Sequence, residues 1–465
     1  MSSKAVLSRR FFIDLYGCAK NQVDAEEIST RLETAGWTRV ADADDADLVL
    51  VNSCGFIESA KKESIDAVLG HKAARPAARV MLAGCLSQRY PDELGEALSE
   101  ADAVFGNADL SRVVEAAEAA LAGSRPVLAP ARVPYRPVER KELFGWKGSA
   151  YVKIAEGCSN RCSFCAIPLI RGDIDSRPVD DVVAEIESLL GRGVYEIDLI
   201  GQDLGSYGRD SDGVQQLPAL LARLSALEGD FRVRMLYIHP DRFPMEILDA
   251  CERDPRVLPY FDIPFQHGSP RVLKAMGRKG DPETYLDLIA IIRGRLPDAV
   301  IRSTFLVGFP GETDEDFALL RDFQDRARLD WLGAFAYSKE EGTVAASMKG
   351  AVPKKVAERR KAGLEAAQGP ITEERMRRFV GREFEVLIEE RIEAATDGGT
   401  ARPASGADDT DAAGDEAFSL GRAWFQAPEV DGLCVVRGDF EPGTVVKART
   451  FALRGVDLEA DPAGA

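Results

Sequence analysis

Three cysteines near the middle of the chain have the spacing of an iron–sulfur site. Cys158, Cys162 and Cys165 lie in EGCSNRCSFC, directly after a predicted strand. Three thiolates at this spacing can bind three irons of a 4Fe–4S cluster and leave the fourth iron open to a substrate or cofactor. A structural zinc site needs four ligands, and no nearby cysteine or histidine completes such a set. The motif therefore predicts a cluster with one open iron.

Three further cysteines share a different feature, because each follows a short apolar run of the N-terminal region. They are Cys18 in LYGCAKN, Cys54 in VNSCGF and Cys85 in LAGCLSQ. The preceding runs are Phe11–Leu15, Ala46–Val51 and Val80–Leu82. The carboxyl ends of parallel strands meet at one edge of a sheet, so these thiols could converge there. Adjacent glycines permit tight turns and a bulky ligand, and they are Gly17, Gly55 and Gly84. By spacing alone, however, three buried thiols that only pack are the preferred interpretation.

The elements around these motifs are predicted to form three domains. Residues 1–122 alternate apolar runs and helical patterns, as in an open parallel α/β domain. Residues 123–149 are rich in proline and are predicted to be a linker. Residues 150–378 contain about six strand–helix repeats, enough for a partial (β/α)6 barrel with its site at the strand carboxyl ends. Residues 379–465 have the short strands of a small β-barrel, with a mobile, low-complexity loop expected at about 396–417.

The overall composition is that of an ordinary globular chain. Its 465 residues are 45% hydrophobic and 29% charged, and they include no apolar run long enough to cross a membrane. The start, MSSKAVLSRRFFIDLYG, lacks the apolar core and cleavage site of a secretory signal. Eight cysteines are too few for a disulfide scaffold and fit metal or redox chemistry in a reducing compartment. We therefore expect a cytoplasmic protein with no membrane segment.

The net charge is strongly negative and is concentrated near the C-terminus. The chain has 77 acidic and 59 basic side chains, for a formal net charge of -18. From Phe379 to Ala465 there are 18 acidic and 8 basic residues. Such a segment repels a phosphate backbone and attracts basic partners, so direct RNA binding is not expected. An acidic surface also aids solubility, so the charge alone identifies no partner.

Taken together, the motifs resemble the radical S-adenosylmethionine (SAM) methylthiotransferases. The matching segments are GCAKNQVDAE, NSCGFIESAKKESID, GCLSQRY, EGCSNRCSFCAIPLIRG, IPFQHGSPRVLKAMGR, RSTFLVGFPGETDEDF and GRAWFQAPEVDG. The resemblance as a whole runs from about Phe11 to Asp457. They are similar to the branch that modifies an aspartate of the twelfth small-subunit ribosomal protein. The transfer-RNA branch commonly has GCQMN at the first cysteine and a CSV-like context at the second, whereas here Cys18 begins CAKN and Cys54 begins CGFI. The resemblance implies a radical SAM barrel and a TRAM-like C-terminal barrel.

The resemblance also implies cofactors and roles. Cys18, Cys54 and Cys85 would hold a second 4Fe–4S cluster, which carries the added sulfur. SAM would bind the open iron of the first cluster, and its reductive cleavage would give a 5′-deoxyadenosyl radical that takes hydrogen from the target aspartate. A reductant protein would supply the electron. The further SAM contacts that it implies are Phe164, Gln202, Gln266, Arg302 and Gly308, with Arg302 facing the SAM carboxylate.

Two alternatives remain at this point. A transfer-RNA methylthiotransferase would have the same fold and chemistry. A non-catalytic iron–sulfur electron carrier is disfavoured, because it needs no barrel large enough for a cofactor. The sequence also departs from the ribosomal-protein branch, with Ala19 where proline is frequent, Gly201 where alanine is frequent, and a longer loop from Thr396 to Ala417.

Several other residues are expected to be structural. Cys251 and Cys434 have no partner motif and are predicted to pack in the core. His71, His239 and His267 form no cluster in the sequence, and none is predicted to be a metal ligand. At least one of Trp424 and Phe425 is expected to lie in the core of the small barrel.

Overall fold

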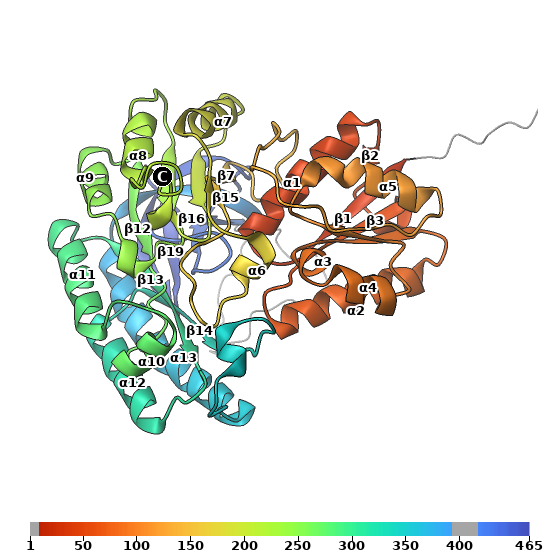
Figure 1. Cartoon of the computed structure of the whole chain (residues 1–465). Coiled ribbons are helices and arrows are strands. Elements are labelled where there is room, and N and C mark those ends of the chain that lie inside the picture. The colour runs from red at the N-terminus through yellow and green to blue at the C-terminus, as the bar shows by residue number, and fades with distance from the viewer. Residues whose placement is uncertain (1–8, 393–416, 465) are drawn as a thin grey trace, which may run out of the picture.

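The structure, a computed structural model that describes residues 9–392 and 417–464, contains two parallel sheets and a closed barrel (Figure 1). Each sheet has six strands and the barrel has five, so the expected three-part α/β architecture is confirmed. The loop expected at 396–417 falls outside the described residues except for Ala417. No helix in the described ranges is both long and apolar enough to span a membrane.

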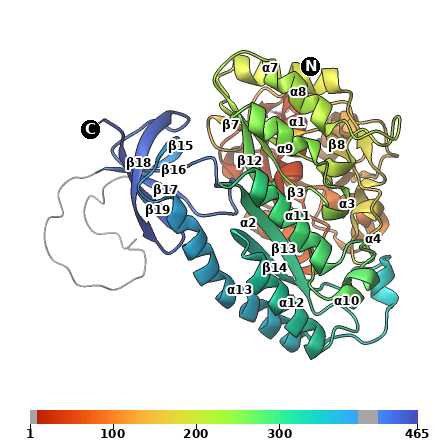
Figure 2. The ribbon, with the colours of Figure 1, turned by 90° about the vertical axis from the view of Figure 1, so that its left-hand side faces the viewer.

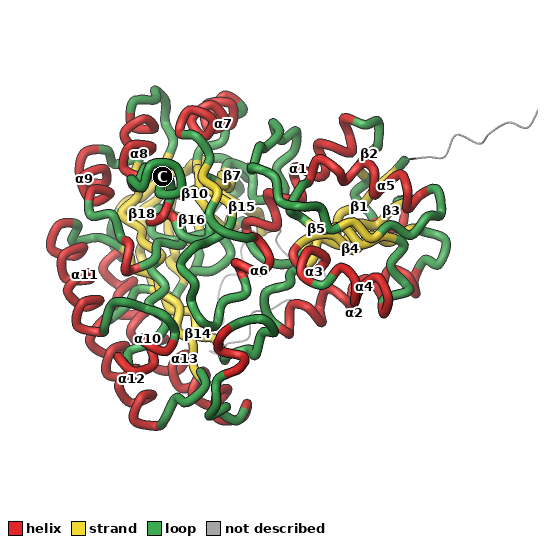
Figure 3. Tube along the Cα trace, viewed as in Figure 1, coloured by secondary structure: helices red, strands yellow, loops and turns green. Residues whose placement is uncertain are grey.

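The N-terminal sheet has the strand order β2-β1-β3-β4-β5-β6 and carries helices on both faces (Figures 1 and 3). Its strands are β1 (Arg10–Leu15), β2 (Thr38–Arg39), β3 (Leu48–Ser53), β4 (Arg79–Gly84), β5 (Ala103–Gly106) and β6 (Val127–Leu128). Its helices are α1 (Ala19–Thr34), α2 (Glu58–Ala74), α3 (Cys85–Arg89), α4 (Pro91–Ala97) and α5 (Val113–Leu121). All residues of β3 are buried, as expected for a central parallel strand covered on both faces.

The proline-rich segment at 123–149 is part of this folded unit. It contributes the edge strand β6, which pairs with β5, and then crosses α1 before β7 begins at Ser149. Arg140 anchors the crossing, since its guanidinium is buried between Glu26 of α1 and Glu185 at 2.5 and 2.7 Å. The segment therefore joins the first two domains through packed contacts.

The central sheet has the order β7-β10-β11-β12-β13-β14, with its helices on the outer face (Figure 2). Its strands are β7 (Ser149–Lys153), β10 (Glu196–Ile200), β11 (Arg232–Met235), β12 (Val257–Asp262), β13 (Val300–Val307) and β14 (Trp331–Ala336). Its helices are α6 (Ile167–Arg171), α7 (Val179–Gly191), α8 (Leu217–Ser225), α9 (Glu246–Arg253), α10 (Pro270–Ala275), α11 (Pro282–Arg295), α12 (Asp314–Ala327) and α13 (Lys354–Met376). A short antiparallel ladder, β8 (Ala155–Glu156) with β9 (Asp175–Ser176), flanks β7. The open order confirms a partial barrel of six strands.

The C-terminal barrel is closed by the order β15-β16-β17-β19-β18. Its strands are β15 (Glu383–Ile392), β16 (Phe418–Arg422), β17 (Cys434–Arg437), β18 (Val445–Arg454) and β19 (Asp457–Pro462). The sequence did not indicate β19, in which acidic residues alternate with Leu458, Ala460 and Pro462. Phe425 is fully buried and stacks on Phe379 with ring centroids 3.9 Å apart, which confirms the expectation for the aromatic pair. Cys251 and Cys434 are buried as predicted.

The C-terminal barrel packs on the inner face of the central sheet, near the amino ends of the strands. Arg422 of β16 pairs with Glu196 at the start of β10 at 2.5 Å, and both side chains are fully buried. The Trp331 indole at the start of β14 donates a hydrogen bond to the Phe425 carbonyl. The contact also extends toward the carboxyl end of β12, because Asp431 accepts a hydrogen bond from Tyr260 at 2.6 Å and pairs with Arg302 at 3.6 Å.

Candidate functional site

The CxxxCxxC motif forms a loop between β8 and α6, at the carboxyl end of β7. The Cys158 amide donates to the Gly172 carbonyl at 3.0 Å, and the Cys165 amide donates to the Cys162 carbonyl at 3.1 Å. The Ile167 amide, at the start of α6, donates to the Cys165 sulfur at 3.4 Å. The backbone therefore fixes the loop with all three thiols half-buried.

The thiols of this loop lie near enough to affect one another's ionisation. Burial, together with the nearby Cys162 thiol, raises the pKa of Cys165 to about 12. Burial also raises the pKa of Cys158 to about 11, with smaller contributions from Asp203 and Cys162. Deprotonation of such thiols requires a compensating positive charge, which bound metal ions can supply.

The other three cysteines converge at one edge of the N-terminal sheet. Cys18, Cys54 and Cys85 directly follow β1, β3 and β4, which are neighbours in that sheet. The thiols of Cys18 and Cys85 both contact Oδ1 of Asn21, at 3.9 and 3.4 Å, so this amide joins them. The expected convergence of the three strand ends is therefore observed.

Glycines allow these three loops to meet. A Cβ atom at Gly17 would lie 3.2 Å from the Cβ of Cys54, and one at Gly55 would lie 2.8 Å from the backbone of Cys85. Any larger residue at Gly55 would push the loop that contains Cys54 away from the loop that contains Cys85. Burial, and then the nearby Cys85 thiol, raises the pKa of Cys54 to about 12.

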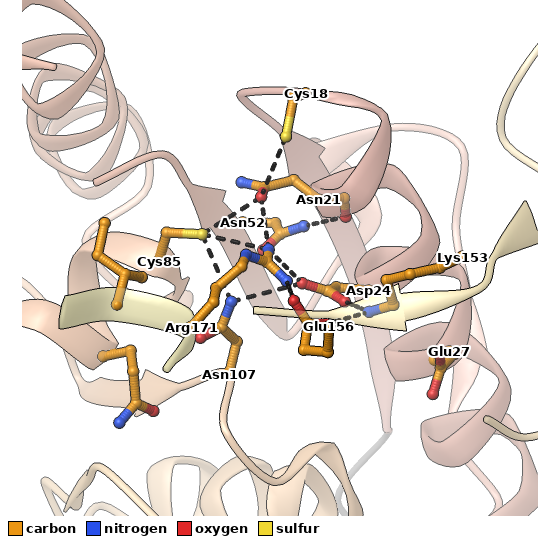
Figure 4. A network of polar contacts seen from close by, with 12 residues as sticks. Cys18, Asn21, Asp24, Glu27, Asn52, Cys85, Asn107, Lys153, Glu156 and Arg171 are labelled. Carbon is orange, nitrogen blue, oxygen red and sulfur yellow. Dashed lines mark hydrogen bonds and ion pairs between the residues drawn. The ribbon is translucent and has the colours of Figure 1, made fainter. Parts of the chain in front are cut away.

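A buried guanidinium contacts Cys85 of the second set and Glu156, which leads into the Cys158 loop (Figure 4). Arg171 ends α6, six residues after Cys165, and its Nη2 donates to the Cys85 sulfur at 3.2 Å and to Asp24 of α1 at 2.7 Å. Its Nη1 donates to Glu156, two residues before Cys158, at 2.9 Å. Lys153 pairs with the same two carboxylates, Asp24 and Glu156, at 2.5 and 2.8 Å. These two cations hold the pKa of Glu156 well below its usual range despite burial.

The remaining predicted contacts lie around the mouth of the partial barrel, but several have structural partners. Gln202 donates to Glu156 at 3.4 Å, while its buried Oε1 has no partner among the described residues. Gln266 follows β12 in the left-handed region, with a φ of 70°. Arg302 is already paired with Asp262 at 3.2 Å. In the sheet, Arg302 of β13 is paired in register with Asp262, the last residue of β12.

Two of the predicted contacts have clear packing roles. Phe164 is half-buried against the apolar cluster that contains Phe309 and Met276. Gly308 has a φ of 77°, and a Cβ there would lie 2.5 Å from the Cβ of Ala357 in α13. The small residue at 308 therefore lets α13 cross the end of β13.

The three histidines have ordinary structural surroundings. His71 contacts Asp14 at 2.7 Å, and the His267 Nδ1 accepts from the Ser269 amide at 2.9 Å. Burial lowers the pKa of His267 to about 3, so its ring is neutral. Within the described ranges, no group of three or more His, Cys, Asp or Glu side chains is placed to hold a single metal ion. A 4Fe–4S cluster distributes its thiolates over different irons, so this geometry differs from that of a one-ion site.

Sequence analysis missed the polar residues that surround the thiols, above all Asn21, Asp24, Glu156 and Arg171. Helix α1 is polar on nearly every face, yet almost all of its residues are buried. A helix of this composition in a buried position requires ionic partners. The charged residues beside each cysteine motif were the sequence signal for these contacts. That signal does not show which residues of distant segments form ion pairs with each other.

The comparisons with known proteins cover most of the chain. The Uncharacterized protein family UPF0004 matches residues 10–106, the Radical SAM superfamily matches residues 152–323, and the TRAM domain matches residues 407–462. A Treponema denticola protein named ribosomal protein uS12 methylthiotransferase RimO is 45% identical, over 96% of this chain and 99% of its own. A Moorella thermoacetica protein of the same name is 41% identical, over 95% of this chain and 96% of its own.

A solved structure has a similar fold at low sequence identity. It is the radical SAM methyltransferase TsrM from Kitasatospora setae with cobalamin and a 4Fe–4S cluster bound. The TM-score is 0.52 and the identity is 18%, over 71% of this chain and 75% of that chain. The similarity supports the fold assignment alone.

Proposed function

Because the chain belongs to the RimO family of radical SAM methylthiotransferases, we propose that it replaces a side-chain hydrogen of an aspartate in ribosomal protein uS12 by a methylthio group. The observation that carries the proposal is the contact of Arg171, at the end of the helix that follows the Cys158 loop, with Cys85 of the second three-thiol set. Methylthio transfer requires a radical at a carbon and a source of sulfur at short range, which one cluster on each of these two contacting domains would supply.

The donor sets fit the cofactors that this reaction needs. Three thiols on each of two loop clusters leave one iron of each 4Fe–4S cluster without a protein ligand. Cys158, Cys162 and Cys165 would hold the cluster that binds SAM, and Cys18, Cys54 and Cys85 would hold the second. When bound, these groups supply the radical chemistry and the sulfur for transfer. The buried Oε1 of Gln202, which lacks a partner among the described residues, is one acceptor available to SAM.

The chain's own residues position these groups. Gly17 and Gly55 let the three N-terminal loops approach, and the Ile167 amide donates to the Cys165 sulfur. Arg171 places positive charge beside Cys85. Its hydrogen bonds to Asp24 of α1 and to Glu156 also hold the Cys158 loop against α1. Such hydrogen bonds to ligand sulfurs tune a cluster and hold its ligands in place.

A reconstitution experiment tests the proposed function. The anaerobically loaded chain should contain about eight irons. With SAM and dithionite, it should give 5′-deoxyadenosine and add the mass of one methylthio substituent to uS12. Tandem mass spectrometry should assign the addition to an aspartate, and uS12 with that aspartate changed to alanine should stay unmodified. Modification of transfer RNA in place of uS12 would refute the substrate.

We also propose that the acidic C-terminal region recruits the basic ribosomal protein. The acidic groups of the described barrel are largely paired within the domain, as in Glu383 with Arg449 and Glu441 with Arg391. By count, residues 393–416 add seven acidic side chains and one arginine. Most of the unbalanced charge of the domain therefore belongs to this segment. We also propose that a reductant protein donates the electron and that the reaction takes place in the cytoplasm.

Neutralising that segment should weaken the encounter with uS12 at low salt. Changing its seven Asp and Glu residues to Asn and Gln should lower the association rate about 10-fold at low ionic strength, because long-range attraction is lost. At physiological salt, screening should shrink the difference. Stopped-flow binding of labelled uS12 measures both rates, with 5′-deoxyadenosine formation as the control for an intact core. Equal rates at low salt would contradict this role.

A further inference from the structure

A buried lysine lies beside the first cysteine of the second set and faces the mouth of the partial barrel. Lys20 is in the first turn of α1, two residues after Cys18, and only 8% of it is exposed. Its Nζ donates to the carbonyl of Gly201, which follows β10, at 3.3 Å. The same atom lies 3.7 Å from the ring centroid of Tyr237, which follows β11. The ammonium is therefore located where two central strands end.

Among the described residues, no carboxylate forms an ion pair with this ammonium, and the nearest opposing charge is that of the Cys18 thiolate. Lys153 offers the contrast, since it is equally buried but pairs with both Asp24 and Glu156. After burial and the Cys18 thiol, Arg171 and then the carboxylates of Glu156 and Asp262 affect the charge of Lys20. However, Glu156 is held by Lys153 and Arg171, and Asp262 is held by Arg302.

A buried ammonium in this setting is suited to receive a negatively charged ligand. It has three N–H donors, of which the Gly201 carbonyl takes one and the ring of Tyr237 provides only a weaker electrostatic contact. Burying a charge without an ionic partner is costly, and a carboxylate is the acceptor that offsets this cost best.

We propose that Lys20 binds the carboxylate of the aspartate that is to be modified. The inference rests on the proposed function and adds the residue that selects the acidic side chain. A carboxylate held at Nζ would lie in the neighbourhood of Cys18, whose charge interacts with that of Lys20 and whose thiol would be a ligand of the second cluster. The methionine carboxylate of SAM is the other possible source of this chemistry. It is expected instead at the open iron of the Cys158 set, which leaves Lys20 to the substrate.

A binding cycle tests the proposal without relying on turnover. A fluorescent uS12 peptide with the target aspartate, and its Asp→Asn form, are titrated into loaded enzyme and followed by anisotropy. The native chain should prefer the Asp peptide by about 10- to 100-fold, as for a hydrogen bond between charged groups. Lys20→Met should bind both peptides equally, and Lys20→Arg should keep part of the preference. Lys62→Met, at an exposed lysine of α2 paired with Asp66, is the matched control.

The outcomes separate the two carboxylate sources and the two proposals. If Lys20→Met keeps the Asp preference, the inference is wrong. If it instead raises the SAM concentration needed for half-maximal 5′-deoxyadenosine formation without peptide, Lys20 serves the SAM carboxylate and the proposal is overturned. If the native chain neither binds nor modifies the Asp peptide, the proposed function itself fails. Melting curves of the variants show whether a loss of binding reflects a loss of folding.

Discussion

Replacing Cys158, Cys162 or Cys165 by alanine is expected to reduce SAM cleavage to background, whereas replacing Cys18, Cys54 or Cys85 should preserve much of it. The first loop lies at the carboxyl end of β7, on the sheet that forms the SAM barrel, while the second set lies on the N-terminal sheet. Loss of one of three thiolates removes an iron ligand and would leave that cluster with two protein ligands. Methylthio transfer should be lost in both groups of variants.

Three measurements check this division of labour. Iron analysis should fall from about eight to about four atoms per chain in either group. Quantified 5′-deoxyadenosine should be lost only in the first group, and methylthiolated uS12 should be absent from both. Cys251→Ala is the matched control, because that thiol is buried in α9 and donates only to the Leu258 carbonyl. Equal loss of cleavage in both groups, with the other cluster intact, would show that the sets do not act separately.

The placement of the six cysteines could be predicted because it follows from local patterns. Each N-terminal cysteine comes directly after an apolar strand, and parallel strands present their carboxyl ends at one edge. β1 ends at Leu15 as expected but begins one residue earlier, at Arg10, while β3 begins at Leu48, two residues later than expected. The edge strands β2 and β6 have only two residues each, too few for a periodic signal.

The surroundings of the thiols could not be predicted, because they depend on contacts between distant segments. Arg171 and Asn21 are 150 residues apart in the sequence, yet their side chains are 3.0 Å apart. Gly308 illustrates the same limit in another way. Its close approach to Ala357, 49 positions later, could not be predicted from the sequence around it, and its proposed contact with SAM stays a prediction.

Arg171→Met is expected to destabilise the chain and also to alter the second cluster. Removing the guanidinium leaves Asp24 and Glu156 with Lys153 as their shared partner, in surroundings that exclude water. Breaking buried ion pairs in this way costs about 3–5 kcal/mol, which chemical denaturation of the chain would measure. The same change removes a positive charge and an N–H donor from the Cys85 sulfur. The reduction potential of the second cluster should therefore fall.

Arg140→Met separates the two effects, because Arg140 is an equally buried arginine with no contact to a thiol. It pairs with Glu26 and Glu185 and donates to the Tyr151 carbonyl at 2.9 Å. Both variants should lose stability to a similar extent, whereas only Arg171→Met should lower the potential in an EPR-monitored redox titration. A potential that is unchanged in Arg171→Met, with full iron content, would show that the contact with Cys85 only supports the fold. A potential lowered in both variants would instead trace the effect to looser packing of α1 against β7.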